Sequence, residues 1–517
     1  MDRKWWTLLA VCTGVFMLLL DITIVNVALP DVQRAFHASL ADLQWVIDAY
    51  ALTLAALLLT AGSIADLAGR RRVFATGIAI FTLGSLLCGL ASGMTFLALA
   101  RAVQGVGGAI MFATSLALLA QAFRPSERGV AFGVFGAVTG VAVAVGPVLG
   151  GAITSGLSWR WIFFVNLPIG LAALAVTLRR VQESRAPGAR RPDWAGCVTF
   201  SVALGALVFG LIRSNADGWG SATVLGLLAL AAVLLVSFVA IEATRSHPML
   251  DLRLLRVPTF TGGLIAAWAI SASIFSLLTY LVLYLQNILG YSPLQAGLRF
   301  LPLTGAIFLT AGIAGRLSAR VPTRWLIAPG FALVALGLVL MRGAQAGGSW
   351  THFLPGFIVA GAGAGLINVP LASTAVGVVE PARAGMASGI NSTLRQVGIA
   401  TGVAGLGSVL ATHLRDSVAS GLQSGPLASH AHQLADAVSD GRIASALHAT
   451  PPGLRGLAAQ AARTGFISAL DSILLIGAGV ALAAAVLTAL LIRRRDFVDA
   501  PDAPAPELAA TRVPVTA

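Results

Sequence analysis

The sequence predicts an all-α polytopic membrane protein, and three observations support this fold class. Of the 517 residues, 57% are hydrophobic and only 11% are charged, and the mean hydropathy is +0.87. Soluble domains carry roughly 25% charged residues. Apolar runs of about 20 residues, the length that a helix needs to cross a bilayer, recur along the whole chain. Basic residues gather in alternate connections between these runs, which is typical of cytoplasmic loops.

Fourteen apolar segments are predicted to span the lipid bilayer. They cover residues 5–29, 43–65, 72–91, 95–120, 129–154, 160–180, 194–213, 221–243, 260–288, 295–315, 323–341, 351–377, 385–411 and 467–492. An even number of spans places both termini on one side of the membrane. That side is predicted to be cytoplasmic, because its loops hold arginine clusters such as Arg70–Arg72, Arg179–Arg180 and Arg493–Arg495.

The charge and the residue inventory exclude several function classes. The formal charge of +13 does not indicate nucleic acid as a partner, because the basic residues form no patch interleaved with aromatic side chains. ATP is not an expected partner either, since Lys4 is the only lysine and a Walker-type phosphate loop requires one. No nucleophile–base arrangement or metal-ligand spacing is present. We therefore expect no enzyme activity, no cofactor and no metal.

An internal repeat divides the chain into two halves. The stretch GAIMFATSLALLAQAFRPSERGVAFG (108–133) is similar to GLINVPLASTAVGVVEPARAGMASG (365–389). Such repeats are typical of secondary transporters built from two similar halves. The spans 194–213 and 221–243 have no counterpart in either half, which indicates an insertion between two six-helix bundles.

The repeat gives a predicted domain organisation. Its parts are residues 1–180 for the N-terminal bundle, 181–256 for the two inserted helices, 257–495 for the C-terminal bundle and 496–517 for a disordered cytoplasmic tail. A long external loop, 412–466, interrupts the C-terminal bundle. Its apolar residues recur loosely at helical spacing, which predicts short amphipathic helices on the outer surface.

Five stretches resemble motifs of the major facilitator superfamily. They are LDITIVNVALP (20–30), GSIADLAGRRRV (62–73), ALARAVQGVGGA (98–109), GVAVAVGPVLGG (140–151) and WRWIFFVNLPIG (159–170). The first and the last are similar to motifs of its fourteen-helix drug:proton antiporter branch. The resemblance implies a major facilitator fold of two six-helix bundles plus two inserted helices. It also implies alternating-access export of amphipathic, often cationic, small molecules in exchange for protons, in a bacterial cytoplasmic membrane.

Three charges at membrane depth are the predicted proton-coupling residues: Asp21, Asp48 and Arg101. A charge in hydrocarbon is costly unless it is paired, neutralised or hydrated. A carboxylate that moves between an apolar site and an arginine changes its proton affinity. Asp21 is the first candidate because it is deeper and lies in a family-like motif. A fixed Asp21–Arg101 or Asp48–Arg101 pair with a structural role only is the alternative.

Two further sets of residues take their expected roles from the resemblance. Asp66, Gly69, Arg70 and Arg128 form a predicted latch on the cytoplasmic side, with Arg70 and Arg128 as candidate partners of the Asp66 carboxylate. The alternative is that the arginines only determine topology. Gly146, Pro147, Gly150 and Gly151 are predicted to bend the fifth helix as in antiporters. Close helix packing is the alternative reading of these glycines.

Polar residues at membrane depth are the candidates for lining a substrate cavity. They are Asn26, Gln104, Tyr284, Asn287, Asn368, Asn391 and Arg395. Hydrogen bonding between packed helices is the alternative role for each of them. The spans 260–288 and 295–315 contain no acidic residue, so we expect neutral or monovalent substrates. Three alternatives to a broad drug exporter stay open, namely a dedicated exporter of one natural product, a proton-coupled importer and a non-transporting membrane sensor or scaffold.

Overall fold

The computed structural model describes residues 2–38, 40–185, 193–245, 248–318, 320–345, 348–380, 383–423, 426–439 and 450–498. Across these residues the chain is helical and contains no strand. This confirms the predicted all-α class. The reason is the apolar composition, because a helix satisfies its backbone hydrogen bonds within its own segment and needs no water.

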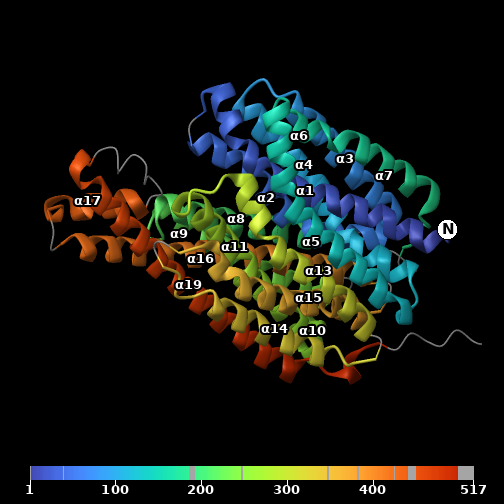
Figure 1. Cartoon of the computed structure of the whole chain (residues 1–517). Helices are drawn as coiled ribbons and strands as arrows, with labels where there is room; N and C mark the ends of the chain where they lie inside the picture. Colours follow the sequence, from blue (N-terminus) through green and yellow to red (C-terminus); the bar gives the residue numbers. More distant parts are fainter. Residues whose placement is uncertain are drawn as a thin grey trace, which may run out of the picture.

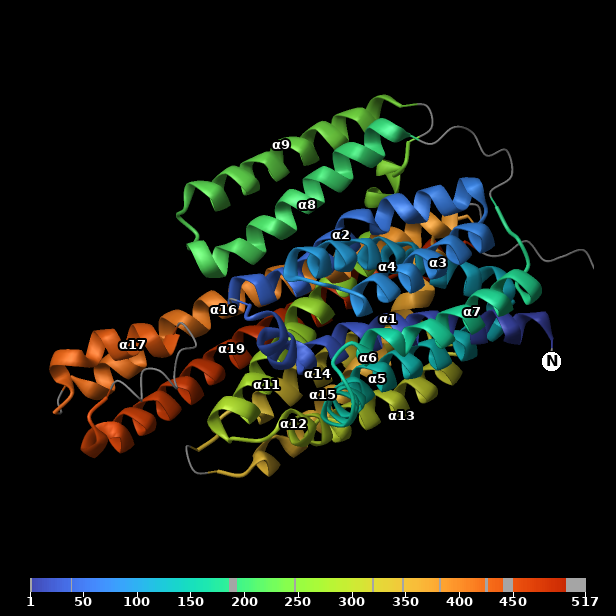
Figure 2. The same cartoon turned by 90° about the horizontal axis from the view of Figure 1, so that it is seen from above.

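Two bundles of helices lie side by side (Figure 1). The first consists of α1 (Arg3–Phe36), α2 (Leu40–Ala68), α3 (Arg70–Gly89), α4 (Met94–Ala122), α5 (Pro125–Gly156), α6 (Trp161–Phe164) and α7 (Asn166–Arg180). The second consists of α10 (Pro258–Ile270), η2 (Ser271–Phe275), α11 (Ser276–Leu283), η3 (Tyr284–Ile288), α12 (Pro293–Arg299), α13 (Leu301–Leu317), α14 (Arg324–Leu340), α15 (Leu354–Gly377), α16 (Ala384–Leu422) and α19 (Arg455–Leu491). Between them in sequence, α8 (Trp194–Asp217) and α9 (Ala222–Thr244) form a hairpin on the outside (Figure 2).

The helices agree with the predicted spans. Eleven described helices, taken together with the short segments that continue them, are long and apolar enough to cross a bilayer. α13 and α14 are apolar but shorter, with 17 residues each, and α5 has 32 residues. Each of the fourteen predicted ranges falls on one of these helical segments. The total of fourteen transmembrane helices stays a prediction, as do the domain limits.

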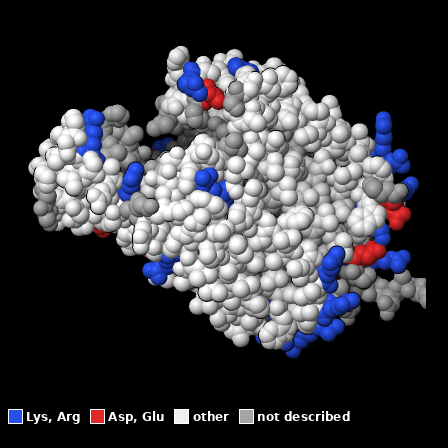
Figure 3. All heavy atoms as spheres, in the orientation of Figure 1, with Lys and Arg blue, Asp and Glu red and all other residues white. Residues whose placement is uncertain are grey.

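One end of the molecule collects the N-terminus and the arginine clusters, and we call it the basic end (Figure 3). Lys4 of α1 pairs with Glu127 of α5 there, at 2.7 Å between Nζ and Oε1. The backbone N–H of Arg493, just after α19, donates to Oγ1 of Thr259 in α10 at 2.7 Å. The basic loops therefore share one end of the molecule, as the positive-inside pattern predicts. Which side of the membrane this end faces stays a prediction.

The two bundles meet at the basic end through glycines. Gly62 of α2 lies against Gly385 of α16, and Gly129 of α5 lies against Gly315 of α13. A Cβ added at Gly315 would lie 2.5 Å from the carbonyl oxygen of Gly129. Only glycine allows backbones to approach this closely. The bundles are thus closed against each other at the basic end.

The α8–α9 hairpin packs over the line along which α2 and α16 meet. The hydroxyl of Ser201 in α8 lies 2.9 Å from that of Thr60 in α2. At the end of α9, the buried carboxylate of Glu242 accepts a hydrogen bond from the backbone N–H of Leu250 at 2.9 Å. The hairpin and the connection that leaves it are thereby held against the bundles.

The connection from the hairpin to α10 also contacts the start of α16. Asp251 accepts a hydrogen bond from Arg383, the residue before α16, at 2.6 Å. Burial alone would raise the pKa of Asp251, but hydrogen bonds from Arg383 and from the backbone N–H of Arg253 lower that pKa below its ordinary value. Asp251 therefore stays charged at neutral pH and keeps this ion pair.

At the end opposite to the basic end, α16 and α19 extend beyond the bundle. α16 has 39 residues, which is about 58 Å at 1.5 Å per residue, against roughly 30 Å for a hydrocarbon core. α17 (Ala431–Ser439) packs against this extension, and its Asp436 pairs with Arg415 of α16 at 2.6 Å. Buried residues such as Leu414 and Phe466 continue the core of the second bundle into the extension.

The extension corrects the predicted external loop 412–466. Residues 412–422 and 455–466 belong to two long helices, so the connection between them is shorter than expected. The reason is a continuous apolar side on α16, where buried residues recur every four positions: Leu406, Leu410, Leu414, Val418 and Leu422. α17 is a short helix of the predicted kind, with Leu434 buried and Gln433 exposed. Residues 440–449 and most of the predicted tail 496–517, from 499 onward, lie outside the described residues.

The contact between α5 and α13 gives a first prediction. We expect Gly315→Ala to lower the thermal stability of the purified protein by about 1–3 kcal/mol, the usual cost of overpacking. The added methyl group would meet the Gly129 carbonyl oxygen. Gly305→Ala in the same helix has nothing within 4 Å of its added Cβ and should be neutral or slightly stabilising. Thermal unfolding in detergent, followed by tryptophan fluorescence, compares the two variants. Equal stability of both would contradict the close contact.

Candidate functional site

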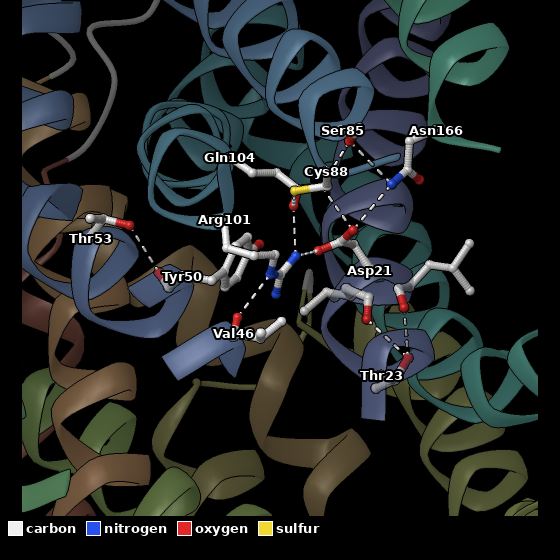
Figure 4. A network of polar contacts seen from close by, with 12 residues as sticks. Asp21, Thr23, Val46, Tyr50, Thr53, Ser85, Cys88, Arg101, Gln104 and Asn166 are labelled. Carbon is white, nitrogen blue, oxygen red and sulfur yellow. Dashed lines mark hydrogen bonds and ion pairs between the residues drawn. The ribbon is translucent and has the colours of Figure 1, made fainter. Parts of the chain in front are cut away.

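A buried ion pair joins the first and fourth predicted spans (Figure 4). Asp21 of α1 is 0% exposed, and Arg101 of α4 is 2% exposed. Nη1 of Arg101 donates to Oδ2 of Asp21 and also to Oε1 of Gln104, the latter at 2.6 Å. Nε of Arg101 donates to the backbone carbonyl of Val46 in α2 at 3.1 Å. The guanidinium is thereby fixed between α1, α2 and α4.

Two further side chains complete the shell around the Asp21 carboxylate. Nε2 of Gln104 donates to Oδ1 of Asp21 at 2.8 Å, and Nδ2 of Asn166 in α7 donates to the same oxygen at 3.2 Å. Both amides also donate to Oγ of Ser85 in α3, at 2.7 and 3.3 Å. Hydrogen bonds of this kind to an ionised carboxylate are stronger than neutral ones. Both oxygens of the Asp21 carboxylate thus accept hydrogen bonds from neighbouring side chains.

The network keeps unused hydrogen-bonding capacity at its edge. The ring of Tyr50 in α2 lies 4.2 Å from the Arg101 guanidinium, in cation–π geometry. The Tyr50 hydroxyl is buried and has no hydrogen-bond partner in the described structure, and neither has Oδ1 of Asn166. Buried polar groups are usually satisfied. The Tyr50 hydroxyl and Oδ1 of Asn166 are thus exceptions at the edge of the network.

Asp48, the other proposed carboxylate, lies outside this network. It is half-buried on α2, two residues before Tyr50 and two after Val46. Within the described part of the chain it makes no hydrogen bond to Asp21 or to Arg101. Of the two pairs weighed from the sequence, the structure contains Asp21–Arg101 and not Asp48–Arg101.

The predicted latch residue Asp66 joins the two bundles at the basic end. Its Oδ1 accepts from Nε and Nη2 of Arg70 at 2.9 and 2.7 Å, and both side chains are buried. Oδ1 also accepts from the backbone N–H of Gly385 at 3.0 Å, and Oδ2 accepts from that of Met386 at 2.9 Å. These N–H groups belong to the first turn of α16, where unsatisfied donors and the helix dipole favour an anion.

Gly69 and Glu183 shape the turn that carries the latch. Gly69 has a φ of +109°, a conformation that residues with a Cβ rarely adopt. A Cβ there would also lie 2.8 Å from the carboxylate of Glu183. That carboxylate accepts from the backbone N–H groups of Arg71 and Arg72 at 3.0 and 3.2 Å. Glu183, which follows α7, thus caps the start of α3.

Arg128 corrects one expected pairing. Its Nη2 donates to the carbonyl of Ala120 at 2.8 Å, and its Nε donates to the carbonyls of Ala120 and Phe123 at 3.1 and 3.4 Å. Arg128 therefore caps the C-terminal end of α4, where a cation is favourable, instead of pairing with Asp66. Within this conformation Arg70 alone of the two candidates contacts the latch carboxylate.

The fifth helix passes through the predicted bend without a break. α5 is continuous from Pro125 to Gly156. Gly146 is buried against α1, and a Cβ there would collide with Oγ1 of Thr23. Gly150 is buried and Gly151 is half-buried, whereas the side chain of Pro147 lies outside the described residues. Close packing of α5 on α1 is thus observed, and the antiporter role of this stretch stays a prediction.

The candidate cavity residues do not form one cluster. Gln104 belongs to the Asp21 network. Tyr284 is 1% exposed and packs between the rings of Phe353 and Phe466 in the second bundle. Nη1 of Arg395 in α16 donates to Oδ1 of Asn368 in α15 at 3.0 Å.

Three further candidates complete the set. Asn391 is 1% exposed and lies one turn before Arg395. The side chains of Asn26 and Asn287 lie outside the described residues.

Sequence reasoning missed three polar residues. Ser85 and Asn166 belong to the Asp21 shell, and Glu183 caps α3. Asn166 lies in the stretch WRWIFFVNLPIG, so the motif itself was the available signal. Ser85 is a single hydroxyl in an apolar helix, and such residues usually bond to their own backbone. Glu183 bonds to backbone groups, which leave no trace in the side-chain pattern.

Comparisons with known proteins agree with the geometry. The sequence profile of the Major Facilitator Superfamily matches residues 11–403. The multidrug resistance protein Stp of Mycobacterium tuberculosis is 40% identical over 409 residues, which cover 79% of this chain and 76% of that protein. The tetracenomycin C resistance and export protein of Streptomyces glaucescens is 34% identical over 513 residues, which cover 98% of this chain and 94% of that protein. Among solved structures, the human organic anion transporter MFSD10 aligns with a TM-score of 0.62 at 13% identity and covers 94% of this chain and 100% of that chain. The last comparison shows the fold alone.

The latch gives a second prediction. Asp66→Ala removes the acceptor that Arg70 shares with the first turn of α16. Loss of one partner of a buried pair costs about 3–5 kcal/mol, so we expect the basic end to open. Spin labels at Thr76 of α3 and Arg316 of α13, both exposed, report the distance between the bundles by pulsed electron paramagnetic resonance. We expect a longer distance or a broader distribution in the variant.

A matched control is available for this measurement. Asp217 pairs with Arg213 on α8 with the same four-residue spacing, but this pair is exposed and lies within one helix. Asp217→Ala should leave the distance distribution unchanged. An unchanged distribution in Asp66→Ala as well would show that Asp66 does not hold the bundles together.

Proposed function

Since this chain belongs to the Major Facilitator Superfamily, we propose that it exports amphipathic small molecules across the cytoplasmic membrane of a bacterium in exchange for protons. Its relatives with 34–40% identity are named as drug resistance and export proteins. The observation that carries the proton coupling is the fully buried carboxylate of Asp21, paired with Arg101 inside the first bundle. Both termini are cytoplasmic in this proposal.

Asp21 acts as the proton carrier because its charge and its partners are coupled. In the described conformation Arg101, Gln104 and Asn166 all donate to the carboxylate. Protonation removes the negative charge and weakens the attraction to Arg101. A buried pair that loses one partner costs about 3–5 kcal/mol, enough to change the preferred arrangement of the helices.

The contact of Asp66 with α16 is the second part of the proposed transport cycle. With the basic end on the cytoplasmic side, the Asp66 contact to α16 closes the transporter toward the cytoplasm. Rocking of one bundle against the other breaks this contact and opens the substrate site to the cytoplasm. If the substrate favours one state and the proton favours the other, each must weaken the binding of the other by the same factor. This reciprocity makes proton influx drive export.

A dedicated exporter of one natural product is the second candidate. It is favoured by the relative from Streptomyces glaucescens, which is named for tetracenomycin C and aligns with 98% of this chain. The two candidates share the mechanism and differ in substrate breadth. A response to a single compound class in the assay below would favour the dedicated exporter.

The central test measures proton release from inverted membrane vesicles. A proton gradient is imposed, a pH-sensitive dye reports the lumen, and antibiotics and lipophilic ions are added one at a time. We expect some compounds to release protons with the wild-type protein and Asp21→Asn to reduce this release to the level of vesicles that lack the protein. The substituted amide cannot take up and release the proton.

Three comparisons make the result interpretable. Asp31→Asn, near the end of the same helix and paired with Arg34, should couple normally. If Asp21→Asn still couples while Asp48→Asn does not, the proton site is Asp48 and the Asp21–Arg101 pair is structural. If wild type releases no protons with any compound, the antiport assignment fails for this panel.

A further inference from the structure

One side of α16 presents three polar side chains, and two of them have a buried polar atom without a partner in the described structure. Ser388, Asn391 and Arg395 are spaced by three and four residues, which places them on one face of the helix. Oγ of Ser388 and Nδ2 of Asn391 are buried, and neither has a hydrogen-bond partner in the described structure. An unmet buried hydrogen bond costs about 1–3 kcal/mol. Packing against neighbouring helices therefore does not by itself explain why polar residues lie on this face of α16.

Arg395 carries a charge at the middle of the membrane. It lies eleven residues into α16, about 17 Å from the helix start at 1.5 Å per residue. The side chain is half-buried, and its printed partner is the neutral side-chain oxygen of Asn368 at 3.0 Å. No carboxylate within the described residues lies at ion-pair distance from it. A cation at this depth needs an anion or water.

The position of the cluster favours a ligand between the bundles. α16 contacts α2 and α4 of the first bundle, and α15, which carries Asn368, contacts α4 and α5. Gly389, next to Ser388, lies against Leu58 and Leu59 of α2. The acidic groups Asp21 and Asp66 are already bound to Arg101 and Arg70. Neither of these two carboxylates is therefore available to Arg395.

We propose that Arg395 and Asn391, supported by Asn368, bind an anionic, acceptor-rich group of the substrate, such as a carboxylate or a phenolate. This inference rests on the proposed export function and specifies its substrate class. The guanidinium supplies charge and the Asn391 amide supplies a second donor one turn away, so two acceptor atoms of one group can be bound together. It refines the expectation of neutral or monovalent substrates to anions.

The test compares two dyes that share one skeleton and differ in charge. The ethyl ester of fluorescein is a monoanion with a phenolate, and rhodamine 6G is a monocation on the same xanthene and phenyl ester frame. Fluorescence polarisation with the purified full-length protein gives both affinities. We expect wild type to bind the anion more tightly than the cation. Arg395→Gln should weaken the anion roughly ten- to hundredfold, the loss of one hydrogen bond to a charged group, and leave the cation unchanged or tighter.

Controls separate recognition from misfolding. Arg415→Gln makes the same substitution in the exposed extension of the same helix and should leave both affinities unchanged. Arg395→Lys keeps the charge and should retain the preference for the anion. If Arg395→Gln does not fold, Asn391→Ala must still weaken the anion and spare the cation. Equal loss for both dyes, or a preference of wild type for the cation that Arg395→Gln leaves intact, overturns the proposal.

The outcome is independent of the export test. Anion binding that depends on Arg395, without proton release in vesicles, would support the subsite and contradict antiport. Proton release by cationic compounds that persists in Arg395→Gln would support antiport and contradict the subsite.

Discussion

The buried pair of Asp21 and Arg101 is the interaction on which the first bundle depends. Neither charge can be hydrated, so each must be satisfied by groups from neighbouring helices. The result is a shell in which α2, α4 and α7 contribute groups that contact the pair, while Ser85 of α3 accepts from the amide of Gln104. Hydrogen bonds therefore add to apolar packing in fixing how these helices are arranged around α1. A change at the carboxylate reaches every one of them.

A second kind of contact occurs twice at the basic end, where a carboxylate accepts hydrogen bonds from the first backbone N–H groups of a helix. Asp66 accepts from the first turn of α16, and Glu183 accepts from the first turn of α3. In both places the acid comes from a different segment of the chain and satisfies N–H groups that a helix cannot satisfy itself. Glu183 acts within one bundle, whereas Asp66 acts between two. The same chemistry thus acts within one bundle at Glu183 and between the two bundles at Asp66.

Much of this arrangement could be predicted from the sequence, because placing a polar or charged group in the bilayer costs much free energy at that one position of the chain. Hydropathy located the helices, and the depth of the charges made Asp21–Arg101 one of two candidate pairs, the other being Asp48–Arg101. Contacts to backbone groups could not be predicted, since the N–H groups of Gly385 and the carbonyl of Ala120 carry no residue-specific signal. This explains the missed role of Glu183 and the wrong partner expected for Arg128. The long extension of α16 was underestimated because its apolar side continues through a stretch rich in small and polar residues.

The α8–α9 hairpin determines from which direction a lipid-soluble compound can reach the space between the bundles. α8 contacts both α2 and α16, so it covers their shared boundary on the membrane side. On another side, α5 and α13 are in direct backbone contact at Gly129 and Gly315. A molecule dissolved in the bilayer meets the hairpin at one boundary and closely packed glycines at the other. In this conformation both boundaries between the bundles are covered near the basic end.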